Sequence, residues 1–206
     1  MYPTPSEFKD LLRTQPLESV VQNYLFEGIP YVFRRLPERQ TKLAQHLGNE
    51  LQTKPENVRI IGSAKIGFSL SPDSFTREFN ERSDIDVLIV DAGLFDRFWH
   101  TILQWHYPRR GRRLAEIDFR WCSARKDDLY WGWFCPDEIR FEGLSFPQSL
   151  APVRDFSTKW FAAFKSLSLY PEFAARDVSG RLYRSWEHAL LYHTAGLSVL
   201  RAIVSI

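Results

Sequence analysis

The chain has 206 residues, a formal charge of +2 at pH 7 and a sequence pI near 8.5. This length allows one sizeable hydrophobic core, or a catalytic domain with a small helical one, and the charge is too small to indicate a nucleic-acid partner by itself. The N-terminus is neither basic nor continuously apolar, and the most apolar stretch, 195–206, is interrupted by Arg201, so we expect a cytoplasmic protein without signal peptide or membrane span.

The first 51 residues have the spacing of helices. Phe8, Leu11 and Leu12 recur at helical intervals after a Pro-Ser-Glu start, and a second apolar run follows over 20–25. A further helix is predicted over 37–51, where leucines form one apolar stripe opposite basic residues. We expect these helices to pack on a sheet.

Two short apolar segments, 58–61 and 85–90, predict buried strands that flank a polar loop. The second segment opens with the carboxylates of Asp84 and Asp86. Residues two apart on a strand face the same side, so these two acids are expected to project together. Paired carboxylates suit Mg²⁺, whose coordination is normally completed by water and substrate phosphates.

The first predicted strand ends in a Gly-Ser turn, Gly62 and Ser63. Glycine lets the backbone approach a ligand closely, and the amides of such a turn form a nest for an anion. Lys65 and the hydroxyl of Ser69 follow at positions from which they could meet phosphate oxygens. A merely solvated Lys65 is an equally open interpretation.

This arrangement resembles the nucleotidyltransferase superfamily of DNA polymerase beta, whose signature is Gly-Ser, a short loop and Asp-x-Asp on the next strand. Gly62 and Ser63 match the first part, and Asp84 and Asp86 match the second. The resemblance implies that the Gly-Ser element grips a nucleoside triphosphate while the acid pair holds metal. The resemblance covers roughly a third of the chain well and the rest only in outline, and the loop between the two parts is longer than in minimal members.

Other phosphate-binding motifs fit this stretch less well. Gly62 and Gly67 have the spacing of a Walker loop, but Phe68 stands where that loop needs lysine, and no Gly-x-Gly-x-x-Gly occurs. The remaining alternative is structural: Asp84 and Asp86 could simply end a turn and cap a strand. Their coupling to an upstream strand and Gly-Ser turn favours the metal-nucleotide interpretation.

A core helix is predicted after Gly93, where apolar residues over 94–105 share one face. The most basic cluster of the chain follows it, and it comprises Arg109, Arg110, Arg112 and Arg113. Such a cluster is either a solvated turn or, beside a metal-nucleotide site, a guide for an RNA backbone.

The segment 114–121 alternates apolar and polar residues, as a half-buried strand does. In the resembled superfamily a third carboxylate on a later strand completes the metal site, which implies a role for Asp118, with Glu116 on the same face as the substitute. The resemblance thus implies that Asp84, Asp86 and Asp118 hold two Mg²⁺ ions. If this stretch is helical instead, no third acid is identifiable.

The second half of the chain is rich in aromatic residues, such as Trp131 and Trp133. These rings fill a core or a partner interface, including self-association, or stack on bases. Cys122 and Cys135 lack the spacing of a zinc site and are expected to be buried thiols. After an irregular connection, helices are predicted over 155–169 and, from Gly180, to the end of the chain.

We therefore expect an α/β (α+β) fold in which residues 1–145 form a nucleotidyltransferase-like mixed sheet flanked by helices, and 146–206 form a C-terminal helical region. The resemblance implies Mg²⁺-dependent transfer of a nucleoside monophosphate from a nucleoside triphosphate to a hydroxyl of RNA, a nucleotide or a protein. Short stand-alone enzymes of this kind resemble bacterial toxins or antiviral defence proteins. The alternative is an inactive module of the same fold that binds a partner protein or nucleic acid.

Overall fold

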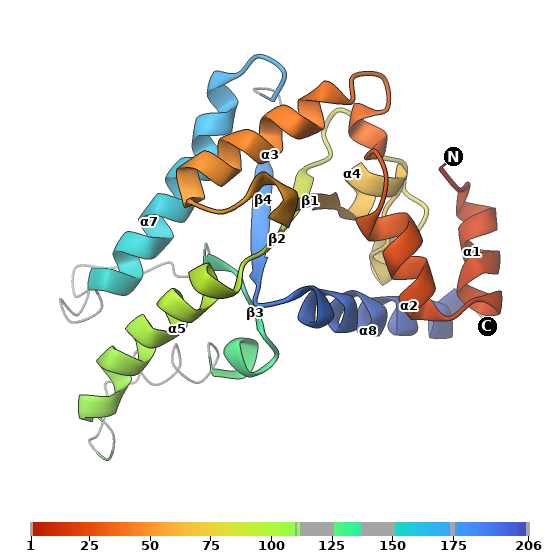
Figure 1. Ribbon diagram of the computed structural model, residues 1–206. Helices are drawn as coiled ribbons and strands as arrows, with labels where there is room; N and C mark the ends of the chain where they lie inside the picture. Colours follow the sequence, from red (N-terminus) through yellow and green to blue (C-terminus); the bar gives the residue numbers. More distant parts are fainter. Residues whose placement is uncertain (1, 110, 112–125, 137–150, 174–175, 205–206) are drawn as a thin grey trace.

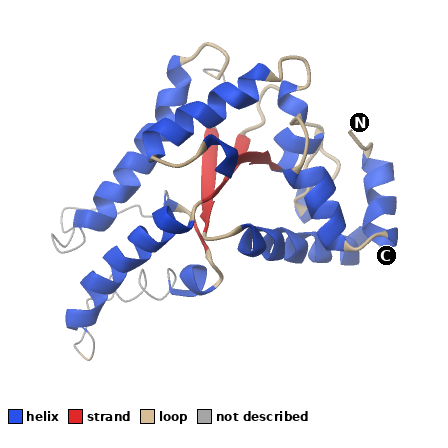
Figure 2. Ribbon diagram, viewed as in Figure 1, coloured by secondary structure: helices blue, strands red, loops and turns tan. Residues whose placement is uncertain are grey.

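The computed structural model describes residues 2–109, 111, 126–136, 151–173 and 176–204. Its sheet has four strands and lies between two groups of helices (Figure 2). The strand order is β1-β2-β4-β3. Their bounds are β1 Val58–Ile61, β2 Ile85–Val90, β3 Trp133–Phe134 and β4 Val178–Tyr183. The α/β class with a helical C-terminus, expected from the sequence, is confirmed.

The sheet is mixed. β1 is antiparallel to β2, β2 is parallel to β4, and β3 is antiparallel to β4. In this register Asp86, near the start of β2, lies opposite Ile61 at the end of β1 and opposite Ser179 on β4. The turn that follows β1 therefore lies beside the beginning of β2, where these two strands end and start.

Three long helices cover one face of the sheet (Figure 1). They are α3 Glu38–Leu51, α5 Ala92–His106 and α7 Ala151–Ser166. Their buried side chains share one hydrophobic core with alternate strand residues, among them Val87 of β2 and Leu182 of β4. The apolar stripes of these helices are buried against this face.

The opposite face is covered by the N-terminal helices and the last helix, which lie on the other side of the sheet in Figure 1. They are α1 Pro5–Thr14, α2 Leu17–Val20, the π-helix η1 Val21–Phe26 and α8 Trp186–Val204. Leu88 and Tyr183 contribute to this second core. Because side chains alternate along a strand, Asp86 and Arg181 share this face with them.

Short helical segments connect the main elements. They are η2 Tyr31–Phe33, η3 Pro55–Asn57, α4 Gly62–Ile66, η4 Pro72–Ser74, η5 Tyr107–Arg109 and η8 Leu167–Leu169. The helix start predicted at the N-terminus is confirmed by a capping box, in which Thr4 and Glu7 exchange side-chain to backbone hydrogen bonds.

The predicted strands 58–61 and 85–90 are confirmed, but the helix predicted from Gly180 onward is wrong at its start. Residues 178–183 form strand β4, and helix α8 begins only at Trp186. An added Cβ at Gly180 would lie 2.3 Å from the Phe164 ring. The strand is therefore fixed by pairing with β2 and by close packing of α7, neither of which is a local signal.

Some predictions fall outside the described residues. These are the strand 114–121 with Glu116 and Asp118, the thiol of Cys122, and the basic residues Arg110, Arg112 and Arg113. Cys135, by contrast, is among the described residues and is buried, as predicted. The sheet takes β4 from the segment expected to form the C-terminal helical region. Among the described helices, none has the length and apolar character needed to cross a membrane.

The contribution of β3 to the core gives a stability prediction. Phe134 is fully buried and stacks on Phe98 with ring centroids 3.9 Å apart, whereas Trp131 is 63% exposed. We expect Phe134→Ala to lower the free energy of unfolding by about 3–5 kcal/mol in urea titrations. Trp131→Ala is the control and should cost far less, so equal losses would contradict the placement of β3 against α5.

Candidate functional site

The end of β1 and the start of β2 bring the Gly-Ser turn against the acid pair. Gly62 has a positive φ of 65°, and a Cβ built on it would lie only 2.9 Å from Oδ2 of Asp86. No other residue fits this conformation and this contact without strain. The two halves of the predicted motif thus meet in space, and Asp84 lines the same cleft as Asp86.

The two acids form a concentrated negative charge. Burial raises the pKa of Asp86, and the nearby charge of Asp84 raises it further, while Arg181 acts in the opposite direction. Within the part of the chain described, neither carboxylate accepts a hydrogen bond or forms an ion pair. Two close carboxylates without a bonded partner are an unfavourable arrangement that a bound cation would relieve.

A cleft of about 580 Å³ opens beside these acids. Its other walls carry hydroxyl, amide and guanidinium groups, all of which can donate hydrogen bonds to phosphate oxygens. The lining residues of this kind are Ser63, Ser69, Ser71, Ser74, Arg77, Asn80, Arg82 and Ser83. The cleft therefore combines oxygen ligands for a hard cation with donors for the polyanion that would accompany it.

The segment before Asp84 is held in place by Arg176. Its Nη1 donates to the carbonyl oxygens of Asn80 at 2.6 Å and Ser83 at 2.8 Å. Within the turn, the Arg82 amide donates to the Asn80 side chain at 2.9 Å. These bonds fix the approach of the chain to Asp84 before any ligand binds.

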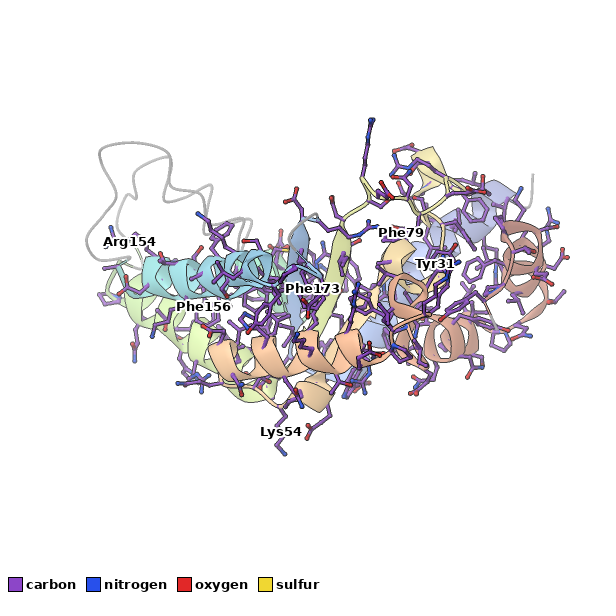
Figure 3. The ribbon with its side chains drawn as sticks, turned by 90° about the horizontal axis from the view of Figure 1, so that it is seen from above. Tyr31, Lys54, Phe79, Arg154, Phe156 and Phe173 are labelled. Atoms are coloured by element: carbon purple, nitrogen blue, oxygen red, sulfur yellow. The ribbon has the colours of Figure 1, made fainter. Side chains whose placement is uncertain are left out.

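The long loop between the turn and the acids is folded back on itself. Phe68 and Glu78 form a β-bridge, and the ring of Phe79 lies 6.3 Å from that of Tyr31, beside which it appears in Figure 3. Ser69 is buried in this loop, where its hydroxyl lies 2.8 Å from that of Ser74. Phe79 and Phe75 pack against the two hydrophobic cores and so attach the loop to the body of the protein.

Lys65 lies apart from the other predicted phosphate ligands. Its side chain is 3% exposed, and its Nζ donates to the carbonyl oxygens of Glu27 and Gly28 at the end of the π-helix. It does not line the cleft of Ser63 and Asp84. The structure therefore brings together Gly62, Ser63, Ser69, Asp84 and Asp86, but not Lys65.

A second cavity of about 300 Å³ adjoins the cleft, with Gly62, Leu70 and Asp86 in both. It contains Arg181, Tyr183 and His193, which the sequence interpretation did not assign to a site. Arg181 and Tyr183 come from β4, which was predicted as helix, and a correct strand assignment would have placed them on the face of Asp86.

The strand parallel to β2 carries no acid beside Asp86. The paired position on β4 is Ser179, and the next residue on the same face is Arg181. Among the described residues no group of three His, Cys, Asp or Glu side chains could hold a metal ion. Asp118, the implied third ligand, lies outside them.

The chain matches none of the protein-family models, curated proteins or solved structures with which it was compared. The function is therefore inferred from the geometry and chemistry of the site.

The contact between Gly62 and Asp86 predicts a specific coupling. Gly62→Ala and Gly28→Ala both place alanine at positive φ, at a cost of roughly 1–2 kcal/mol each, but an added Cβ at Gly28 meets nothing within 4 Å. We expect a double-mutant cycle with Asp86→Ala to show a coupling of at least about 0.5 kcal/mol for position 62 and none for position 28. Urea unfolding measures both, and equal couplings would contradict the contact.

Buried Lys65 predicts a pH-dependent stability. Burial lowers the pKa of Lys65 from 10.5 to about 8, against an opposing effect of Glu27. The folded state then binds fewer protons than the unfolded state between these two values, so this group's contribution to stability rises as the pH rises through that window. Relative to Lys65→Met, the free energy of unfolding of the wild type should increase from pH 8 to pH 10.5.

The control for this prediction is Lys54→Met, because Lys54 extends into solvent (Figure 3). The stability difference between this variant and the wild type should stay constant over the same pH range. A Lys65→Met difference that also stays constant would show that burial of the ammonium group is not coupled to folding.

Proposed function

We propose that the protein is a nucleotidyltransferase that moves a nucleoside monophosphate from a nucleoside triphosphate to a hydroxyl group. One observation carries the proposal: the Gly62 turn approaches the carboxylate of Asp86 within a cleft that also holds Asp84 and many side chains that can donate hydrogen bonds to phosphate oxygens. The resemblance to the superfamily of DNA polymerase beta agrees with this geometry.

The donor set fits Mg²⁺, since Asp84 and Asp86 offer unpaired carboxylate oxygens at the mouth of an open cleft. When bound, the ion would neutralise the triphosphate and lower the pKa of the attacking hydroxyl. We propose Asp118 as a further ligand. A second ion is part of the same proposal.

The residues of the chain would bind and orient the triphosphate. Ser63 and Ser83 offer hydroxyl groups in the same cleft as the acid pair, and Arg82 and Arg77 offer positive charge there. Such fixed donors stabilise the charge that develops on the phosphate oxygens without reorganising during the reaction. Gly62 leaves room for the ligand beside Asp86.

In the proposed reaction the acceptor oxygen forms a bond to the α-phosphorus, and the bond from that phosphorus to the bridging oxygen breaks. Pyrophosphate leaves and the hydroxyl proton is released. Positioning of the two reactants supplies much of the acceleration in chemistry of this kind. The two adjoining cavities meet at Asp86, which is where the two reactants would meet.

A second candidate function is binding of a partner without catalysis. Tyr130 and Trp131 are 78% and 63% exposed, although large rings are usually buried unless they form an interface. This surface would serve a partner protein or self-association. It is compatible with an enzyme as well, so the transfer assay decides between the two.

Labelled nucleoside triphosphates with Mg²⁺ test the catalytic proposal. Incubation with total RNA, or with no RNA, should transfer label to RNA, to a small nucleotide product or to the protein. Asp84→Asn and Asp86→Asn should each reduce transfer by at least about 100-fold, because each removes a ligand charge from the phosphate site.

Asp73→Asn is the matched control, since Asp73 is an exposed acid of the same loop that lines neither cavity. It should retain nearly full activity. Transfer that survives in the Asp84 and Asp86 variants would overturn the catalytic assignment. Absence of transfer in the folded wild type would favour the binding module.

A further inference from the structure

The cavity beside Asp86 is lined by residues of the sheet and closed by two helical segments. Asp86 of β2, Arg181 of β4 and Cys135 after β3 line it, because alternate residues of paired strands face the same side. His193 of α8 and Leu25 of the π-helix complete the lining. The chain thus brings segments that are distant in sequence to one small space.

Arg181 is held firmly within this cavity. Its Nε donates to Cys135 Sγ at 3.2 Å, and its guanidinium carbon lies 4.6 Å and 4.5 Å from the ring centroids of Trp133 and Tyr192. Tyr183 is a further electrostatic partner. Contacts with ring faces and a thiol fix the plane of the guanidinium group, and none of these partners is a carboxylate.

No Asp or Glu in the described part of the chain forms an ion pair with Arg181, although the charge of Arg181 acts to lower the pKa of Asp86. The nearby His193 cannot add a second cation at neutral pH, because burial and the charge of Arg181 lower its pKa to about 4. Burial also keeps Tyr183 protonated by raising its pKa. Apart from Asp86, no acid lines the cavity among the described residues, and a largely buried guanidinium group without an ion-paired carboxylate can bind an anion, since buried charges are normally paired.

The cavity has more room than a single inorganic anion needs. Apolar side chains form much of its wall and could cover the face of a ring; they are Leu25, Ile61, Leu70 and Val87. Ser179 and His193 add hydrogen-bonding groups for the edge of such a ring. A ligand that combines one oxyanion with one ring system would therefore use the guanidinium group and the apolar wall together.

We propose that the Arg181 cavity binds a nucleoside 5′-monophosphate, with the phosphate on the guanidinium group and the base against the apolar wall. The role of this molecule as the acceptor rests on the proposed function, since its sugar hydroxyl groups would then face Asp86. Binding itself does not rest on it. Among RNA, protein and nucleotide acceptors, this cavity selects a small nucleotide.

Calorimetric titration in EDTA tests the binding without any contribution from metal at the acid pair. The probes are the four nucleoside 5′-monophosphates, the four matching nucleosides and inorganic phosphate. At least one monophosphate should bind about tenfold or more tightly than its nucleoside and than phosphate, since charge-assisted and apolar contacts act together. Asp86→Asn should tighten this binding, because it removes a like charge beside the phosphate.

Arg181→Gln should lower the affinity for the monophosphate by about tenfold or more. Arg184→Gln is the control, because Arg184 pairs with Asp96 at 3.0 Å and does not line the cavity, and it should bind within about twofold of the wild type. Circular dichroism and thermal unfolding establish that both variants fold. If Arg181→Gln is unfolded, Arg181→Lys replaces it. This variant should also weaken binding, because lysine keeps the charge but cannot donate two parallel hydrogen bonds to a phosphate as the guanidinium group does.

Several outcomes would overturn the proposal. These are the absence of binding by every monophosphate, equal binding by the Arg181 and Arg184 variants, and equal binding by phosphate alone, which would indicate an adventitious anion. An unchanged or weaker affinity in Asp86→Asn would overturn the placement beside that acid. A failed transfer assay leaves these metal-free affinities unaffected, so failure of the proposed function is distinguishable from failure of the cavity assignment.

Discussion

The close approach of Gly62 to Asp86 is the constraint on which the site depends. It follows from the antiparallel register of β1 and β2, which sets Ile61 opposite Asp86 and so places the turn after β1 beside the first residues of β2. A slip of one residue would turn Asp86 toward the opposite face, against the core formed by α3, α5 and α7. The register therefore has to be fixed. The rest of β2 is apolar on both faces, so what opposes a slip within this strand is the cost of moving the Asp86 carboxylate into that apolar core.

Occupation of both sides of β2 decides what else can surround the acid pair. With β1 on one side and β4 on the other, the cross-strand neighbours of Asp86 are Ile61 and Ser179, and Arg181 follows on the same face. Asp86 thus interacts both with the negative charge of Asp84 and with the positive charge of Arg181. This balance accounts for the pKa of Asp86, which burial and Asp84 raise and Arg181 lowers. A cation at the acids and an anion at Arg181 would each relieve part of the imbalance.

The sequence predicted β1, β2 and the meeting of their ends because these features depend on short-range patterns. It failed at β4 because the periodicity of α8 can be extended backward: Leu182 lies four residues before Trp186, as in a helix. What makes residues 178–183 a strand is the hydrogen-bonding edge of β2 and the packing of Phe164 on Gly180. Both partners are distant in sequence, and tertiary contacts override local periodicity.

Lys65 and Arg181 show why the charged part of the site was the hardest to predict from the sequence. Lys65 was the candidate because it is near Ser63 in sequence, but on helix α4 the two residues differ by about 200° around the axis. If Ser63 faces the cleft, Lys65 must face away, and its ammonium group is held by carbonyl oxygens of the π-helix region. Arg181 has no sequence relation to the motif and reaches Asp86 only through the parallel pairing of β4 with β2. Proximity in sequence therefore identifies the ligands on one short turn, whereas the cation opposite the acids can be identified only from the sheet.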